Sequence, residues 1–483
     1  MSFKYLLSLF AGITLLAASC GEDPAEPPQI EVAAPKLVST QPEAGRSAEI
    51  KNGECTVELS FDQSVICPQA KRSEISVSPS TANISGIKAL DRKVSISLNN
   101  LDYSSEYKII IPKGCVTGYK DNVAEALEFS FTTAEDPRQG MVSDPDQSLS
   151  NPSPSANAKK LYESLLSIYG KHSLSGTMGG TAWETSCADY IYNQTGIYPA
   201  IVGFDYIFNN WPPKYWDACP DYNDISVIRD AWKKGNVIQI GWHWCMPTAE
   251  GITDPNKYNY KNAVKAERAV TEGTWENAEM KKQVAQIASF LQLLQKEDIP
   301  VLWRPLHEAA GDYKWGAWFW WGNGGSEVCK KLWRYMYDCF TNEYGLNNLI
   351  WVWTVQTSYE GKPADVSYLK DWYPGDDCVD IVGADLYLSK GVSSVDQFNL
   401  VNLSVKGKKM VTMSEFGNLP NLDDCYENGA LWLYYMNWCA FDENGKPALY
   451  SKNSDGTYSW NNSVQDWKTI LQNTLTYNRG DLK

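Results

Sequence analysis

Two glutamates follow apolar, β-rich runs in this 483-residue sequence. Glu308 closes "VLWRPLHE", and Glu415 lies in "KMVTMSEFG" much further along the chain. One carboxyl group can give or accept a proton during a reaction, and a second one facing it can attack an electrophilic carbon. The two glutamates are therefore the candidate catalytic pair, provided that the fold brings them together.

Other groups that could assist this pair also follow β-rich runs. Arg304 and His307 precede Glu308, His243 lies in "GWHWC", and Tyr387 lies in "ADLYL". Arg304 shares a face of its predicted strand with Glu308, so it can point into the protein beneath the glutamate or form a structural ion pair. These two roles are compatible, and we expect all four side chains to lie near the pair.

Aromatic residues are concentrated in the same part of the chain. The sequence contains 20 tryptophans, and all of them lie at or after Trp183. Aromatic side chains cover the apolar faces of pyranose rings, while polar neighbours bind the hydroxyl groups. We expect four of them to form such a platform, namely Trp318, Trp320, Trp321 and Trp438. Two carboxyl groups beside a sugar platform are what the hydrolysis of a glycosidic bond requires.

Eight apolar, β-rich segments could position these residues. Helix-like stretches such as 277–297 and 326–345 separate several of them, and this alternation predicts a (β/α)8 TIM barrel over residues 153–483. The predicted strands are residues 172–178, 199–208, 236–245, 300–308, 348–355, 379–388, 409–417 and 431–439. Active sites of such barrels lie at the carboxyl ends of the strands. Glu308 on the fourth strand and Glu415 on the seventh are then expected on opposite sides of the barrel mouth.

The preceding block, residues 36–134, has a different pattern. Short runs such as "CTVELSF", "KVSISL" and "LEFSFTT" alternate apolar and polar residues between turns, which is typical of an antiparallel β-sandwich. The closing "FSFTT" resembles bacterial immunoglobulin-like modules. Proline-rich segments flank the block, so we interpret residues 20–35 as a tether and residues 135–152 as a linker. The block could bind carbohydrate or serve as a spacer, and its lack of tryptophan favours the spacer.

The first residues are typical of an export signal. A lysine precedes an apolar run from Leu6 to Ala18, which is shorter than the roughly 20 residues that span a bilayer. Residues 1–19 are therefore expected to be removed, and Cys20 resembles the lipidated first residue of a bacterial lipoprotein. Ala17 stands where leucine is usual, which leaves simple secretory cleavage as an alternative. With the acidic residues that follow, the segment resembles Bacteroidetes surface lipoproteins and predicts an outer-membrane anchor that faces the cell surface or, alternatively, the periplasm.

Charge and cysteine content narrow the expected partners. A net charge of -15 would repel a nucleic acid, so a neutral substrate fits better. The chain has 12 cysteines without C-x-x-C spacing, and an odd number remains once Cys20 is set aside. A zinc site is not expected, whereas disulfides are permitted in an exported protein. We expect a monomer that uses neither a metal nor an organic cofactor.

Several motifs together resemble glycoside hydrolase family 26, whose typical member is a retaining endo-β-1,4-mannanase. The motifs are "RPLHE", "WFWWG", "YPGDDCVDIVGADLY" and "SEFG", with "GWHWCMP" and "WLYYMNW" in agreement. The resemblance covers nearly all of residues 160–480. It implies that Glu308 is the proton donor and that Glu415 is the nucleophile.

The same resemblance assigns substrate-binding roles. Six residues match positions around the reactive sugar, namely His243, Arg304, His307, Trp318, Tyr387 and Trp438. His307 and Tyr387 are implied to hydrogen-bond near the nucleophile. The sequence departs from the family in the longer "AAGDYKWGA" between Glu308 and "WFWWG", which leaves open whether Trp315 or Trp318 occupies the matching place.

The resemblance implies a two-step reaction on mannan, glucomannan or galactomannan. Glu308 would protonate the glycosidic oxygen while Glu415 attacks, and Glu308 would then deprotonate the incoming water. This mechanism requires a carboxyl separation of roughly 5 to 5.5 Å. Alternatives are activity on mixed-linkage β-glucan or β-1,3-xylan, as in relatives within the family, or a surface glycan-binding lipoprotein without turnover. The presence of both glutamates favours the enzyme.

Overall fold

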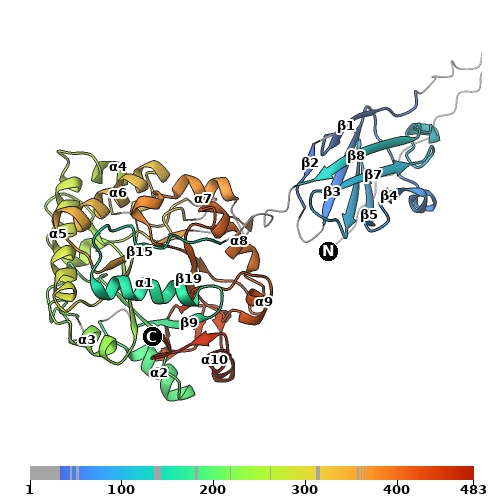
Figure 1. Cartoon of the computed structure of the whole chain (residues 1–483). Helices are drawn as coiled ribbons and strands as arrows, with labels where there is room; N and C mark the ends of the chain where they lie inside the picture. The colour runs from blue at the N-terminus through green and yellow to red at the C-terminus, as the bar shows by residue number, and fades with distance from the viewer. Residues whose placement is uncertain are drawn as a thin grey trace, which may run out of the picture. The chain divides into compact units, whose positions relative to one another are not determined.

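The structure is a computed structural model, and the chain divides into two compact units, Met1–Gln139 and Gly140–Lys483 (Figure 1). The structure describes residues 33–43, 46–50, 54–134, 143–179, 183–217, 219–261, 263–311, 316–355, 358–359, 362–363 and 365–482. The predicted signal segment, Cys20 and most of the predicted tether lie outside these residues.

The N-terminal unit is a sandwich of two four-stranded sheets. One sheet has the order β1-β3-β6-β5, and the other has the order β2-β8-β7-β4. The strands are β1 Leu37–Gln41, β2 Ser47–Ala48, β3 Cys55–Phe61, β4 Ser76–Ser78, β5 Asn83–Leu90, β6 Lys93–Asn99, β7 Glu106–Ile111 and β8 Leu127–Thr133. The pairs are antiparallel, except that the short β2 runs parallel to β8.

Alternation along the strands explains this packing. In β3 every second residue is buried, namely Val57, Leu59 and Phe61, and β6 buries Val94 and Ile96 in the same way. Successive side chains of a strand point to opposite faces, so one face of each sheet becomes the core and the other stays in water. The predicted immunoglobulin-like β-sandwich is confirmed.

The second unit contains a closed barrel of eight parallel strands. They pair in the order β10-β11-β14-β15-β18-β19-β20-β9, and β9 pairs with β10 to close the ring. The strands are β9 Ser173–Met178, β10 Ile201–Asp205, β11 Val237–Trp242, β14 Val301–Pro305, β15 Leu349–Val355, β18 Ile381–Leu386, β19 Met410–Phe416 and β20 Tyr434–Asn437. A short strand, β25 (Thr476–Tyr477), adds a further parallel pairing to β9. Each predicted strand contains one of these eight, and the predicted (β/α)8 barrel is confirmed.

Helices cover the outside of the barrel (Figure 1). They are α1 Ala156–Ile168, α2 Ser186–Thr195, α3 Ser226–Lys233, α4 Ala266–Ala269, α5 Trp275–Gln295, α6 Ser326–Asp338, α7 Val366–Trp372, α8 Val395–Ser404, α9 Leu422–Glu427 and α10 Val464–Leu471. The longest, α5, begins where the side chain of Thr274 accepts a hydrogen bond from the backbone of Asn277. Among the described helices none is both long and apolar enough to cross a bilayer.

Helices cover the outer face of the barrel strands and side chains fill the interior, so neither face of these strands is exposed to solvent. Every residue of β9, β10, β11 and β14 is buried. This explains why the strands appear in the sequence as nearly continuous apolar runs. A charged residue in such a strand must find a partner inside the barrel.

Residues 143–152, the end of the predicted linker, lie against the barrel unit. The backbone N–H of Asp144 donates to Gly407 O at 3.0 Å, and that of Ser150 donates to Asp380 Oδ1 at 2.5 Å. The buried ammonium group of Lys409 donates to Asp146 Oδ2 at 2.7 Å. These contacts attach the segment to the ends of β18 and β19.

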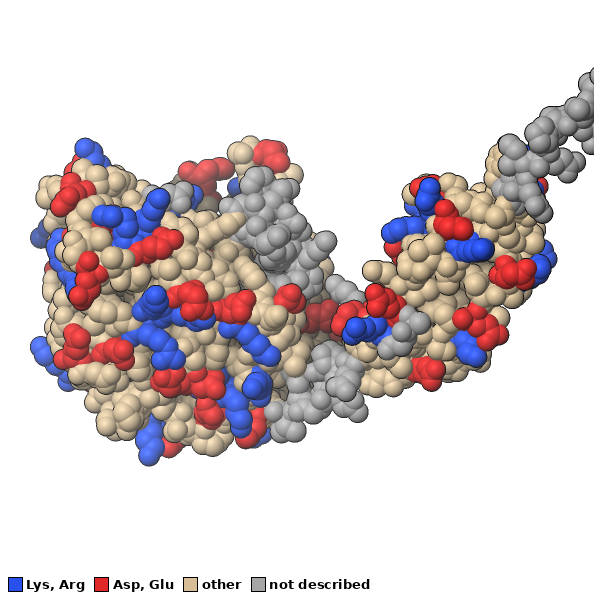
Figure 2. All heavy atoms as spheres, turned by 90° about the horizontal axis from the view of Figure 1, so that it is seen from above, with Lys and Arg blue, Asp and Glu red and all other residues tan. Residues whose placement is uncertain are grey.

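Acidic and basic side chains are interspersed over the face shown in Figure 2. Exposed ion pairs also occur in the described part of the chain, such as Lys408 with Asp144 at 3.0 Å. The net charge is therefore spread over this face, and no broad basic area appears there that would attract a polyanion.

Candidate active site

The polar side chains of the site come from the carboxyl ends of several barrel strands. Arg304 lies in β14, Asp385 in β18 and Glu415 in β19, where Asp385 and Glu415 are neighbours in the strand register. Glu308 follows β14, and His243 follows β11. Parallel strands end on the same side of a barrel, so residues distant in sequence converge there.

Arg304 is the centre of a buried ion-pair network. Its Nη1 donates to Glu415 Oε1 at 2.8 Å, its Nη2 donates to Asp385, and its Nε donates to Thr354 Oγ1 at 2.8 Å. Burial alone would lower the pKa of Arg304, but the charges of Asp385 and Glu415 outweigh it and raise the pKa above its ordinary value. The guanidinium group therefore fixes two carboxylates in place.

Glu415 is held at both of its oxygens. Arg304 binds Oε1, and the hydroxyl of Tyr387 donates to Oε2 at 2.7 Å. The carboxylate is almost completely buried. These two donors hold Glu415 in one orientation, in which one of its oxygens lies within 4.8 Å of an oxygen of Glu308 and of Asp385.

Glu308 lies in a strained turn. Its φ is +50° and that of Leu306 is +52°, a left-handed conformation that residues with side chains rarely adopt. Neighbouring contacts maintain the turn, since Trp321 Nε1 donates to the carbonyl oxygen of His307 at 2.9 Å. Trp318 Nε1 donates to Glu308 Oε2 at 2.9 Å. The turn thus directs Glu308 over the barrel mouth.

Burial and the charge of Glu415 raise the pKa of Glu308 to about 7, against smaller opposing effects of Arg304 and the Trp318 hydrogen bond. One carboxylate oxygen from each of Glu308, Asp385 and Glu415 lies within 4.8 Å of the others. Such a cluster resembles a cation site, but Arg304 already supplies the positive charge to two of its members. Glu308 and Glu415 are close enough to act on the same bond.

Two histidines lie beside the carboxyl groups, with ring centroids 4.4 Å apart. His243 Nδ1 is 2.7 Å from Asp205 Oδ2, and its backbone N–H donates to Asp205 Oδ1 at 3.0 Å. Burial opposes the charged form, but Asp205 outweighs it and raises the pKa of His243. Burial, followed by the charge of His243, lowers the pKa of His307 well below its ordinary value. His307 is therefore neutral at neutral pH.

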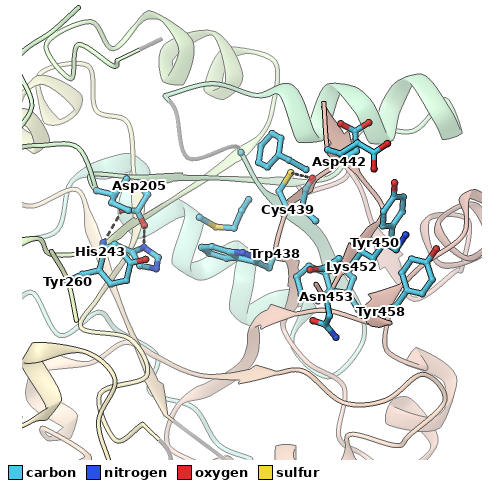
Figure 3. Close-up of a pocket in the computed structure, with 18 residues that line it drawn as sticks. Asp205, His243, Tyr260, Trp438, Cys439, Asp442, Tyr450, Lys452, Asn453 and Tyr458 are labelled. Atoms are coloured by element: carbon cyan, nitrogen blue, oxygen red, sulfur yellow. Dashed lines mark hydrogen bonds and ion pairs between the residues drawn. The ribbon is translucent and has the colours of Figure 1, made fainter. Parts of the chain in front are cut away.

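A cleft of about 620 Å³ opens beside these groups (Figure 3). Asp205, His243, Tyr260 and Trp438 line one part of it. The other part is formed by residues 440–461, which follow the last barrel strand. The backbone N–H of Trp438 donates to Phe416 O at 3.0 Å, which places this tryptophan beside the strand that carries Glu415.

The structure brings the eight predicted site residues into one region, but it corrects the expected sugar platform. Trp320 and Trp321 are fully buried and cannot contact a sugar, so that part of the prediction is wrong. Their indole N–H groups donate to the carbonyl oxygens of Trp244 and His307, respectively. These two hydrogen bonds support the loop beneath the site. Trp318 contacts Glu308, whereas Trp315 lies outside the described residues.

Sequence reasoning missed several partners of the catalytic pair. Asp205 holds His243, Asp385 binds Arg304, and Thr354 and Ser414 complete the buried network. A signal was present, because Asp205 and Asp385 are single acidic residues within apolar strand runs, "IVGFD" and "IVGADL". A carboxylate in a fully buried strand needs a charged or donor partner.

The second unit of the protein is a closed (β/α)8 barrel in which two carboxyl groups face each other and one of them has a raised pKa. These features place it in the class of barrel proteins equipped to act on glycosidic bonds. Residues 150–462 match glycosyl hydrolase family 26, and the chain belongs to this family. Residues 31–133 match a bacterial Ig-like domain.

Curated relatives agree with this family. The chain is 36% identical over 302 residues to a mannan endo-1,4-β-mannosidase of Thermothelomyces thermophilus, covering 61% of this chain and 57% of that protein. It is 33% identical over 316 residues to mannan endo-1,4-β-mannosidase B of Piromyces sp, covering 64% and 51%. The chain thus spans about half the length of the curated relatives it matches.

Solved structures give the same result. The family 26 domain of an endo-β-mannanase/endo-β-glucanase from Prevotella bryantii has a TM-score of 0.60 at 31% identity, covering 70% of this chain and 100% of that one. A β-mannanase from a symbiotic protist of the termite Reticulitermes speratus, complexed with gluco-manno-oligosaccharide, has a TM-score of 0.57 at 32% identity, covering 70% and 98%.

Proposed function

We propose that the barrel unit is a retaining endo-β-1,4-mannanase that cuts internal linkages of mannan, glucomannan or galactomannan. The observation that carries this proposal is the pairing of Glu308, whose pKa is raised to about 7, with Glu415, which Arg304 and Tyr387 hold close by. The oxygen separation within 4.8 Å agrees with retaining glycosidases, whose carboxyl groups are roughly 5 to 5.5 Å apart, rather than the roughly 6.5 to 9.5 Å of inverting ones. The relatives' names support β-mannan as the substrate.

In the first step, Glu308 gives its proton to the glycosidic oxygen as Glu415 attacks the anomeric carbon. Trp318 Nε1 donates to Oε2 of Glu308, and since Oε1 has no hydrogen-bond partner among the described residues, Oε1 can carry the proton. Arg304 and Tyr387 keep Glu415 from rotating away from the sugar. The leaving chain departs with the proton, and a covalent glycosyl-enzyme remains.

In the second step, Glu308 is ionised and removes a proton from the incoming water, whose oxygen attacks the anomeric carbon. The bond to Glu415 breaks, and its carboxylate returns to Arg304. Formation of the ester neutralises Glu415 and so removes one cause of the raised pKa of Glu308, which favours its change from acid to base. His243, which Asp205 holds in place, and Trp438 lie where they can bind the sugar during both steps.

The proposal is tested by incubating the purified protein with glucomannan and galactomannan and measuring new reducing ends. We expect Glu308→Ala and Glu415→Ala each to lower kcat by roughly a hundredfold to ten-thousandfold or more. Proton NMR should show the β-anomer as the first product. Full activity in either variant, or an α-anomer as the first product, would contradict the mechanism.

A pH profile tests the role of Glu308 separately. The proton donor must be protonated in the free enzyme, so kcat/KM should fall as the pH rises through about 7. The same preparation should be offered lichenan and β-1,3-xylan. Faster turnover of either would change the substrate, whereas binding without turnover of any glycan would identify a surface glycan-binding protein instead.

We further propose that the protein is anchored to the outer membrane through a lipid on Cys20, with the Ig-like unit as a spacer. The predicted export signal supports this location, as does the disulfide between Cys187 and Cys439, since disulfides persist in exported proteins. Labelling cells with an alkyne fatty acid should tag the wild type but not Cys20→Ala. Protease treatment of intact cells distinguishes a surface location, where the protein is degraded, from a periplasmic one.

A further inference from the structure

The segment 440–461 forms the outer part of the cleft and has no role in the chemistry described above. It folds into two hairpins, β21 (Ala440–Phe441) with β22 (Pro447–Ala448), and β23 (Tyr450–Lys452) with β24 (Tyr458–Asn461). Figure 3 shows Tyr450, Lys452, Asn453 and Tyr458 grouped at one end of the cleft, with Trp438 between them and His243.

The cleft lies on the nucleophile's side of the bond to be cut. Trp460, which belongs to the cleft lining, has its ring centroid 5.7 Å from that of Tyr387, the donor to Glu415. Neither catalytic glutamate is itself part of the lining, but Trp438, which is, donates its backbone N–H to Phe416 in the strand that carries Glu415. The leaving group departs toward the proton donor, and the nucleophile binds the sugar that remains. Sugars linked to that retained unit therefore extend into this cleft.

The far end of the cleft has the chemistry of a site for a neutral, hydroxylated ring. Lys452 and Tyr458 are cross-strand partners in the hairpin, and the Tyr450 and Tyr458 rings are 5.7 Å apart. Within the described part of the chain, Lys452 forms no ion pair and neither tyrosine hydroxyl has a hydrogen-bond partner. Aromatic faces with free donors and the nearby carboxylate of Glu443 offer both apolar contact and hydrogen bonds, as sugar sites do.

The segment is also held firmly in place. Asn453 bonds with Thr457 and Ser459 within the hairpin, and Asn462 Nδ2 donates to Gly417 O at 2.8 Å. A Cβ at Gly417 would come within 3.0 Å of Trp460, so glycine permits this close docking against the end of β19. A fixed site loses little conformational entropy when a ligand binds.

We propose that Tyr450, Lys452 and Tyr458 bind the second and later hexose units on the retained side of the scissile bond and so set the chain length that this protein prefers. The inference rests on the proposed β-mannanase function. It assigns to this hairpin a specificity role that is separate from catalysis, because Trp438 lies between the three side chains and His243 (Figure 3), so that they act only on substrates long enough to reach them.

The test compares Lys452→Met and Tyr458→Phe with the wild type on mannotriose through mannohexaose. Lys452→Met keeps an unbranched apolar side chain but removes the charged ammonium group, and Tyr458→Phe keeps the ring but removes the hydroxyl. We expect kcat/KM on mannopentaose and mannohexaose to fall about tenfold for Lys452→Met, as for the loss of a hydrogen bond from a charged group. The loss should be smaller for shorter substrates. Cleavage of mannohexaose labelled at its reducing end should shift toward the non-reducing end.

Lys446→Met is the matched control, because Lys446 lies in the turn of the same segment but outside the lining, and it should retain the wild-type length profile. Calorimetric titration of mannotetraose into Glu308→Ala, with and without Lys452→Met, measures binding without turnover and should show a similar tenfold difference in Kd. Equal Kd values and equal length profiles would overturn the inference even if mannan is hydrolysed. If the wild type did not hydrolyse mannan but its binding of mannotetraose still depended on Lys452, only the proposed reaction would be overturned.

Discussion

The two units of the chain place their charges in opposite environments. In the sandwich, Lys93 and Glu58 pair at 2.8 Å with side chains that are 56% and 38% exposed. In the barrel, Arg304 pairs with Asp385 and Glu415, and the three side chains are 2%, 0% and 6% exposed. The sandwich leaves one face of each sheet in water, whereas the barrel strands are covered on both sides.

This difference shows how to recognise the functional part of the molecule. Exposed pairs contribute little to stability and occur on any soluble surface. A buried ionic network loses solvation and rarely stabilises a fold more than apolar residues of the same size would. Its presence in the barrel alone, among the described residues, therefore indicates that the charges serve a reaction.

The largest effect on stability is expected from Arg304→Met, which breaks the buried network. Two carboxylates would remain in the barrel without their cation, and removal of one partner from a buried ion pair costs roughly 3 to 5 kcal/mol. Urea unfolding followed by tryptophan fluorescence would measure this, since all tryptophans lie in the barrel unit. A loss below about 1 kcal/mol would mean that water enters the site and that the charges of the barrel are no less solvated than those of the sandwich.

A second contrast lies in the cysteines. The barrel contains the disulfide Cys187–Cys439, which joins α2 to the residue after Trp438, whereas Cys67 and Cys115 in the sandwich are buried free thiols. Dithiothreitol should therefore destabilise the barrel by roughly 2 to 4 kcal/mol and leave the sandwich unchanged. Calorimetry on the whole protein can follow the two transitions. Cys187→Ser should abolish the response, and an equal shift of both transitions would refute the prediction.

The barrel and its catalytic pair could be predicted because each rests on a local pattern. Strands covered on both sides produce apolar runs that are visible in one sequence, and Glu308 and Glu415 lie at the ends of two such runs. The sandwich strands followed from alternation in the same way. By contrast, β5 leaves a weak signal in the sequence, because none of the residues of "NISGIKAL" is fully buried and a bulge interrupts its alternation.

What could not be predicted depends on contacts between distant segments. The run "WFWWG" does not reveal which rings face the cleft, and the burial of Trp320 and Trp321 follows from donors that reach Trp244 and His307 in other loops. Nor does the sequence show that residues 440–461 wall the cleft, because this depends on how two hairpins dock against the end of β19.

A smaller effect on stability than that of Arg304→Met is expected at Glu308, because the folded barrel disfavours the charged form of this carboxyl group. The folded state raises the pKa of Glu308 to about 7, whereas the unfolded value is near 4.3. The contribution of the protonated Glu308 to the free energy of unfolding is therefore fully present below about pH 4.3 and is lost as the pH rises through about 7. Glu308→Gln should thus stabilise the barrel at pH 8 by about 1 to 2 kcal/mol, allowing for solvent screening at this partly exposed group. At pH 4 the two proteins should be equally stable. A variant less stable than the wild type at pH 8 would contradict this.

The smallest effect is expected in the sandwich, where Lys93→Ala removes one partner of an exposed pair. Both groups regain water when the pair breaks, so the free energy of unfolding should change by less than about 1 kcal/mol, and salt should reduce even that difference. A double-mutant cycle with Glu58→Ala, read from the calorimetric transition of the sandwich, isolates the pair from other effects of each change. A coupling free energy of roughly 3 to 5 kcal/mol, as expected for a buried ion pair, would show that burial does not distinguish the charges of the two units and that buried charges do not mark the site of reaction.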